Sequence, residues 1–203
     1  SEHNERSVPE KTIAHLIKEL PAFPEHLQLM YLILFCTGIR KSEVCTIKSG
    51  AFYSQGNDNW MRIYQSKMRR EKVIPVPSLL VGLVNDYEKK YGIKNGEYLF
   101  KNKRGGEFKG QTFSNQMIRE CKVRGIACGD YIFRAHDYRH NLATSMYGNG
   151  VSIQGVRDYL GHSSENMTKQ YIDFMPERIV SAEDKYFSKN QSFKLKGAED
   201  DER

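Results

Sequence analysis

An almost continuous apolar run at positions 27–35 (LQLMYLILF) limits the possible folds of this chain more than any other feature. Leu27, Met30, Tyr31 and Leu34 follow the spacing of one helical face, and leucine and isoleucine side chains fill the remaining sides. A helix that is apolar all round has to be covered by other elements. The run is much shorter than the roughly 20 residues of a membrane-spanning helix. We therefore expect a central, buried helix and no membrane partner.

The patterns around this helix predict a mainly α-helical domain with one small sheet. Pro9 precedes an amphipathic pattern, and Pro21 and Pro24 end that pattern before the central helix. β-rich stretches with a turn at Asn57-Asp58 predict a three-stranded antiparallel β-sheet, with strands at 51–53, 60–64 and 72–76. Further helices are expected at about 78–91, 112–124, 136–148, 152–160, 164–173 and 176–187.

These patterns place the chain in the α+β class, mainly α. We expect one domain over 8–189, between a disordered N-terminus at 1–7 and a flexible acidic tail at 190–203. The four cysteines are scattered without a CxxC pair, so no zinc site is expected. We expect reduced thiols in a cytoplasmic protein. The polar N-terminus shows no signal peptide.

The basic residues of this chain are unevenly distributed. The formal net charge is +6, and Lys and Arg cluster around 62–72 and 101–109. A basic surface suits a polyanion such as nucleic acid, although many basic surfaces are merely solvated. The candidates for DNA contact in these clusters are Arg69, Arg70, Lys72, Lys103 and Arg104.

Two candidate sites lie in the first half of the chain. The segment TGIRKSE at 37–43 ends the central helix and starts a short one, with Arg40 and Glu43 on one face. Arg40 could hold an anion there while Glu43 fixes its side chain, but an ordinary surface ion pair has the same pattern. Lys67, in the basic hairpin between two predicted strands, is the second candidate, and Arg70 and Lys72 are equally available by charge.

The segment HDYRH at 136–140 places three polar side chains on one helical face. His136, Arg139 and His140 stand at i, i+3 and i+4. The HExxH zinc motif does not fit, because Asp137 replaces the glutamate and a guanidinium repels a dication. A phosphate fits better, since Arg139 offers a bidentate fork and His136 can donate a hydrogen bond.

The last candidate segment runs from Leu160 to Tyr171. Leu160-Gly161-His162 is expected to close one helix with Gly161 as its cap, and a serine then caps the next helix. That helix presents Tyr171, nine residues after His162. With 12 tyrosines in the chain, a core aromatic is the ordinary interpretation of any one of them.

Taken in order, these segments resemble the catalytic domain of the tyrosine recombinase (phage integrase) family, over about residues 8–187. The resemblance implies that Arg40 and Arg139 bind the non-bridging oxygens of a DNA phosphate with the help of His136 and His162. It implies that Lys67 protonates the leaving 5′ oxygen and that Tyr171 becomes the 3′-phosphotyrosine. Supporting roles fall to Glu43 and His140, and no metal, ATP or other cofactor is required.

The resemblance also implies the biological setting. Double-stranded DNA is the expected partner, with a homotetramer on two DNA sites that exchanges strands for integration, excision or transposition. An N-terminal DNA-clamping domain of the family is not expected within this chain, so the chain resembles a catalytic fragment of a mobile-element integrase or transposase. The alternatives are DNA relaxation, as in type IB topoisomerases, a DNA-binding module without catalysis and, least favoured, a metal enzyme built on His136 and His140.

Overall fold

The computed structural model describes residues 8–160 of the chain, which include seven α-helices and one three-stranded sheet. The helices are α1 (Glu10–Glu19), α2 (Glu25–Thr37), α3 (Lys41–Cys45), α4 (Ser78–Tyr91), α5 (Gly110–Val123), α6 (Ala135–Gly148) and α7 (Ile153–Leu160). The strands are β1 (Phe52–Gln55), β2 (Asp58–Gln65) and β3 (Arg70–Pro75), and 3-10 helices span Leu20–Ala22 and Ile126–Gly129. The predicted α+β class, mainly α, is confirmed. The helices predicted at 164–173 and 176–187, His162 and Tyr171 lie outside the described residues.

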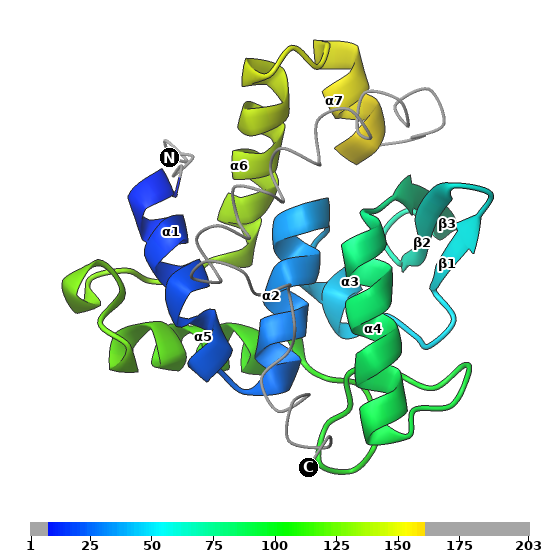
Figure 1. The fold of residues 1–203 in the computed structure, drawn as a ribbon, viewed down its shortest axis with the longest axis horizontal. Coiled ribbons are helices and arrows are strands. Elements are labelled where there is room, and N and C mark those ends of the chain that lie inside the picture. Colours follow the sequence, from blue (N-terminus) through cyan, green and yellow to red (C-terminus); the bar gives the residue numbers. More distant parts are fainter. Residues whose placement is uncertain (1–7, 161–203) are drawn as a thin grey trace.

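Helix α2 is the centre of the domain, as the apolar run predicts. Every residue from Leu27 to Thr37 is buried. Figure 1 shows α2 in the middle of the molecule, and α3, α4, α5 and α6 all contact it. Each large apolar side chain buried in this way contributes about 1.5–3 kcal/mol to folding. Between residues 8 and 160, no helix is long and apolar enough to cross a membrane.

The sheet lies at the edge of the molecule and packs on α3 and α4 (Figure 1). Its strand order is β1-β2-β3 and both pairings are antiparallel. Side chains alternate between the two faces of a strand, so Lys72 and Ile74 of β3 point to the same side, and both are buried. Lys72 pairs with Ile63 of β2, another buried residue. Because side chains alternate along β3, Lys72 of this basic hairpin points toward the core.

Two local details differ from the sequence prediction. The turn between β1 and β2 falls at Gly56-Asn57 rather than Asn57-Asp58, because Gly56 takes a left-handed conformation (φ +62°) that side chains disfavour. The 3-10 helix at Ile126–Gly129 was not expected. It contains Ala127 and Cys128 at positive φ, which neither residue type predicts.

Gly38 ends α2 in the left-handed conformation, with φ +60°. A Cβ at this position would stand 2.9 Å from Leu142 Cδ2 and 3.5 Å from Arg139 Cα, so α6 packs directly against the end of α2. Gly92 ends α4 with nearly the same φ, +62°, but a Cβ there meets nothing within 4 Å. The two glycines therefore share a backbone requirement and differ in packing.

We expect Gly92→Ala to cost about 1 kcal/mol, the penalty of a side chain in the left-handed region. Gly38→Ala should cost more by at least about 1 kcal/mol, because it also overpacks the α2–α6 contact. Urea unfolding of both variants measures the difference. Equal losses of stability would contradict the close approach of α6 to Gly38.

Candidate functional site

Arg40 stands at the N-cap of α3, directly after the end of α2. Glu43 reaches back over one turn, and its carboxylate Oε1 accepts a hydrogen bond from the Arg40 backbone N–H at 3.0 Å. The same oxygen lies 3.7 Å from Arg40 Nη1. The Glu43 side chain is only 6% exposed, whereas Arg40 is 40% exposed. The predicted pairing is confirmed, and it holds Arg40 with its guanidinium partly open to solvent.

Arg139, in the second turn of α6, ties two helix ends together. Its Nη1 donates to the carbonyl oxygen of Gly38 at 3.1 Å and its Nη2 donates to that of Leu160 at 2.5 Å. Carbonyls at helix C-termini lack helical partners and carry the negative end of the helix dipole, so a guanidinium suits them. Burial lowers the pKa of Arg139, and the neighbouring Arg40 charge acts in the same direction. Arginine nonetheless stays charged at neutral pH.

Lys72 reaches the same place from β3. The side chain is 6% exposed, and its ammonium donates to the carbonyl oxygen of Tyr159 and lies 5.9 Å from the centre of the Tyr159 ring. Burial, followed by the Arg139 charge, lowers the pKa of Lys72 from 10.5 to about 8, while Glu43 opposes this effect. The sequence placed Lys72 among surface residues that contact DNA. It is instead a buried group, because the period of β3 points it inward.

These groups form one cluster with an excess of positive charge. The charges of Arg139, Arg70 and Arg40 lower the pKa of Lys72, the Arg40 charge lowers that of Arg139, and Glu43 is the carboxylate that opposes both effects. Glu43 Oε2 is buried and has no hydrogen-bond partner within residues 8–160. Three cations against one anion leave the cluster suited to a bound anion. The described residues contain no group of three or more His, Cys, Asp or Glu side chains placed to hold a metal ion.

The other predicted site residues lie around this cluster. His136 and His140 share α6 with Arg139, and the first is exposed and the second half-buried. Lys67 is exposed in the turn between β2 and β3, and the structure does not bring it into the cluster. Arg69, in the same turn, has a positive φ of 51°. The contacts of Lys72 and Arg139 with helix-end carbonyls could not be read from the sequence, although the alternation in the stretch KVIP at 72–75 already places Lys72 on the inner face.

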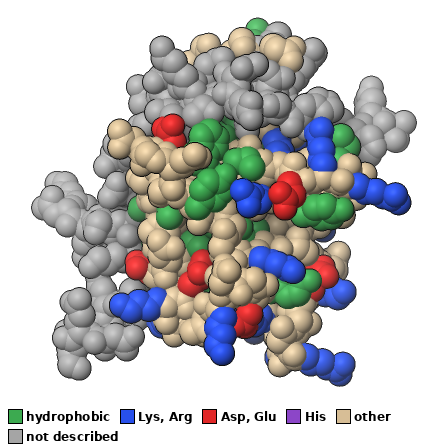
Figure 2. Space-filling model, turned by 90° about the vertical axis from the view of Figure 1, so that its right-hand side faces the viewer, with side chains coloured by type: hydrophobic (Ala, Val, Ile, Leu, Met, Phe, Trp, Pro, Cys, Tyr) green, Lys and Arg blue, Asp and Glu red, His purple; other side chains and the backbone are tan. Residues whose placement is uncertain are grey.

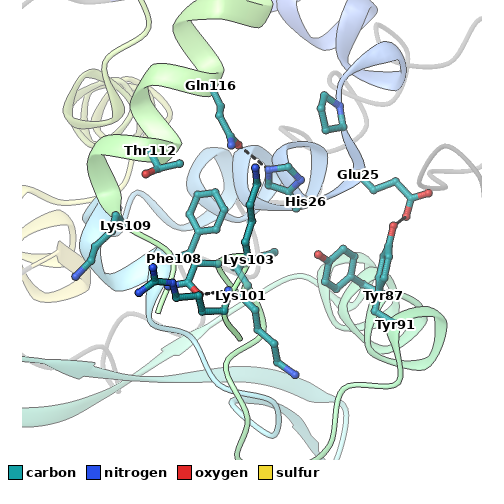
Figure 3. A pocket seen from close by; sticks show the side chains of 14 residues that line it. Glu25, His26, Tyr87, Tyr91, Lys101, Lys103, Phe108, Lys109, Thr112 and Gln116 are labelled. Carbon is teal, nitrogen blue, oxygen red and sulfur yellow. Dashed lines mark hydrogen bonds between the residues drawn. The ribbon is translucent and has the colours of Figure 1, made fainter. Parts of the chain in front are cut away.

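Lys103 and Arg104 lie far from the cluster, in the loop between α4 and α5. They border a cavity of about 730 Å³ at the N-terminal end of α2, whose wall includes His26 and Phe108 (Figure 3). In the lining of this cavity, His26 Nε2 forms a hydrogen bond of 2.7 Å with Gln116 Oε1 of α5. The charge cluster lies at the other end of α2, a separation of about 20 Å along a helix of this length.

On the face shown in Figure 2, basic side chains alternate with acidic ones rather than forming one patch. This face belongs to the right-hand side of Figure 1, where the sheet and α4 lie. Interspersed charges of both signs produce only a weak net field. The concentration of positive charge at the end of α2 therefore does not extend over this face.

Comparison with known proteins shows which family this chain resembles. The family model described as the phage integrase family matches residues 6–178. Transposase B from transposon Tn554 of Staphylococcus aureus strain Mu50 is 31% identical over 190 residues, which are 91% of this chain and 30% of that protein. Tyrosine recombinase XerC of Rickettsia bellii strain RML369-C is 27% identical over 155 residues, 75% of this chain and 48% of the relative. The chain thus matches 30% and 48% of the lengths of these two relatives.

Solved structures share the fold. The XerA recombinase superposes with a TM-score of 0.64 at 22% identity, covering 88% of this chain and 64% of that one. The lambda integrase catalytic core gives a TM-score of 0.58 at 20% identity, covering 78% of this chain and 95% of that one. The fold shared with the second structure thus includes almost the whole of that chain.

The buried Lys72 makes stability depend on pH in a specific direction. Its folded pKa of about 8 lies below the unfolded value of 10.5, so between these values the unfolded chain binds more protons. The free energy of unfolding should therefore rise with pH in this window, relative to Lys72→Met, by about 3 kcal/mol at most. Buried tyrosines act oppositely at higher pH, but they are common to both proteins and cancel in the difference. Denaturant unfolding at pH 7, 8, 9 and 10 tests this, and a constant difference would contradict the burial of a charged Lys72.

Proposed function

Because this chain belongs to the phage integrase family, we propose that it is the catalytic domain of a site-specific DNA recombinase. It cleaves one DNA strand at a time, holds the broken end as a phosphotyrosine, and rejoins it to a new partner. The observation that carries this proposal is the cluster at the end of α2, where Arg40, Arg139 and Lys72 outnumber the single carboxylate of Glu43. An excess of positive charge favours an anion, and the family match supports a DNA phosphate as that anion.

The two arginines are the proposed phosphate ligands. Two of the five N–H groups of Arg139 go to the carbonyls of Gly38 and Leu160, which leaves three for phosphate oxygens. The guanidinium of Arg40 is held by Glu43 from the buried side and keeps its partly exposed side for the phosphate. Fixed donors of this kind stabilise the extra negative charge that develops on the phosphoryl oxygens in the transition state. His136, His140 and His162 are proposed to assist from the adjoining elements.

Tyr171 is the proposed nucleophile. A phenol has an unperturbed pKa of about 10, and nearby cations favour the more nucleophilic phenolate. As its oxygen bonds to phosphorus, the bond from phosphorus to the 5′ oxygen breaks, and Lys67 protonates that leaving oxygen. The phosphotyrosine conserves the energy of the broken bond, so a 5′-hydroxyl can reverse the step without ATP. The exposed turn that carries Lys67 gives its side chain room to approach bound DNA.

The proposed partner is double-stranded DNA, and the proposed assembly is a homotetramer on two DNA sites. The structures with this fold include, by their titles, the XerH recombinase bound to its difH substrate and a lambda integrase tetramer bound to a Holliday junction. The similarity to a transposon-encoded transposase favours a mobile element as the setting and the bacterial cytoplasm as the place of action. Arg69, Arg70, Lys103 and Arg104 are the proposed contacts to DNA beyond the cleaved phosphate.

The central test is formation of a covalent adduct. The chain is incubated in EDTA and at low salt with nicked suicide substrates of randomised sequence, in which loss of the short cleaved fragment traps the intermediate. We expect a protein–DNA adduct that survives denaturation and falls at least about 100-fold in Tyr171→Phe, because removal of the nucleophile removes the bond. Tyr147→Phe, at an exposed tyrosine of α6, is the matched control and should behave like the wild type. An adduct that persists in Tyr171→Phe, or one that needs a divalent metal, would exclude the proposed mechanism.

The proposed DNA contacts are tested by salt dependence. If Lys103 and Arg104 each neutralise one phosphate, the double alanine variant should lower the slope of log affinity against log salt by about 2. Replacing Lys11 and Lys18, two exposed lysines of α1 outside the basic clusters, removes the same charge and should leave the slope nearly unchanged. Fluorescence anisotropy with a labelled duplex gives both slopes, and an equal effect of the two double variants would argue against a DNA contact at this loop.

A further inference from the structure

Three elements meet at the last turn of α7. Lys72 of β3 donates to the carbonyl of Tyr159, and Arg139 of α6 donates to the carbonyl of the next residue, Leu160. The last four carbonyls of a helix have no partner within it and carry the negative end of its dipole. Two cations from different elements therefore hold consecutive carbonyls of one helix end.

The burial of Lys72 is not explained by stability. A buried ammonium loses hydration, and its attraction to a carbonyl offsets that cost only in part. The lowered pKa of Lys72 reflects this cost. A methionine of similar length would fill the same space without the penalty, so an apolar side chain would serve packing alone at least as well. The presence of a buried ammonium group therefore calls for another explanation, which its hydrogen-bond partner supplies.

The ammonium of Lys72 binds the C-terminal end of α7. Leu160 is followed directly by Gly161 and His162, and Tyr171 comes eleven residues after Leu160. The position and direction of the last helical turn set where this following chain begins. Arg139 ties the same turn to Gly38, which lies two residues before Arg40. Arg139 thus connects the end of α7, after which the chain continues to the proposed nucleophile, with the segment that carries Arg40.

We propose that Lys72 is a positioning residue of the recombination reaction, whose ammonium anchors the end of α7 and thereby sets the approach of Tyr171 to the phosphate held by Arg40 and Arg139. This inference rests on the proposed function. It separates the two lysines of the β2–β3 hairpin: Lys67, exposed in the turn, is the proton donor, and Lys72, buried in the strand, acts through α7 without touching DNA.

The first test needs no DNA. Hydrogen exchange is measured on the full chain for the wild type and for Lys72→Met, Lys72→Arg and Lys67→Met. Loss of the anchor in Lys72→Met should speed exchange of the amides of α7 at least about tenfold, while amides of α2 keep their protection and show that the fold is intact. Lys72→Arg should restore part of the protection, and Lys67→Met should leave α7 unchanged. Unchanged exchange of α7 in Lys72→Met would overturn the anchor, whether or not the chain proves to be a recombinase.

The second test separates positioning from proton donation. Adduct formation is measured on a suicide substrate with the natural 5′ oxygen and on one with sulfur in its place, since a thiolate leaves without being protonated. Lys72→Met should lose at least about tenfold in rate on both substrates, while non-specific DNA binding stays within about threefold of the wild type. Lys67→Met should be slow on the oxygen substrate and recover on the sulfur substrate.

Recovery of Lys72→Met on the sulfur substrate would identify Lys72 as the proton donor and overturn the positioning role. A wild-type rate of Lys72→Met on the oxygen substrate would overturn it as well. Absence of any adduct from the wild type would refute the proposed function instead, and the exchange measurement would then still decide whether Lys72 anchors α7.

Discussion

The two hydrogen bonds of Arg139 join the ends of α2 and α7 to α6, and the proposed site depends on them. One binds Gly38, where the buried helix α2 ends, and the other binds Leu160, where α7 ends. Carbonyls at the C-terminus of a helix have no partner within that helix, and the guanidinium supplies a donor to both while it joins three elements. The same side chain lies in the charge cluster, and therefore any rotation of α6 would move the cluster and both helix ends at once.

The cluster is tolerable only because each cation has a fixed partner. Arg139 and Lys72 bind helix-end carbonyls, and Arg40 is held by Glu43. Burial first, and repulsion between neighbouring cations second, lower the pKa values of Lys72 and Arg139, so keeping these groups charged costs free energy in the absence of a counter-ion. That cost is recovered when an anion enters. In the proposed function, the cluster is thus arranged for a phosphate before one binds, and little rearrangement is needed when negative charge develops during the reaction.

Much of this could be predicted from the sequence, where short-range rules apply. The apolar run identified α2, the proline and glycine positions gave its ends, and the three-residue spacing of Arg40 and Glu43 predicted their pairing. What the sequence could not give are the contacts between distant residues. Arg139 and Gly38 are 101 positions apart, and Lys72 and Tyr159 are 87 apart, so no local spacing relates them. The sequence prediction therefore groups Lys72 with its basic neighbours, whereas its pairing with the buried Ile63 places its side chain on the inner face of the sheet.

The hairpin shows how one basic stretch can supply two different cations. In the turn at 66–69 the side chains are exposed, and Lys67 can follow a mobile or incoming partner. In β3 the two-residue period fixes direction, so Lys72 must face the core and meet α7. A group that transfers a proton has to reach the reacting atom, whereas a group that positions a helix has to stay in place. The backbone conformation at each lysine, rather than its charge, therefore determines which of the two proposed tasks it can perform.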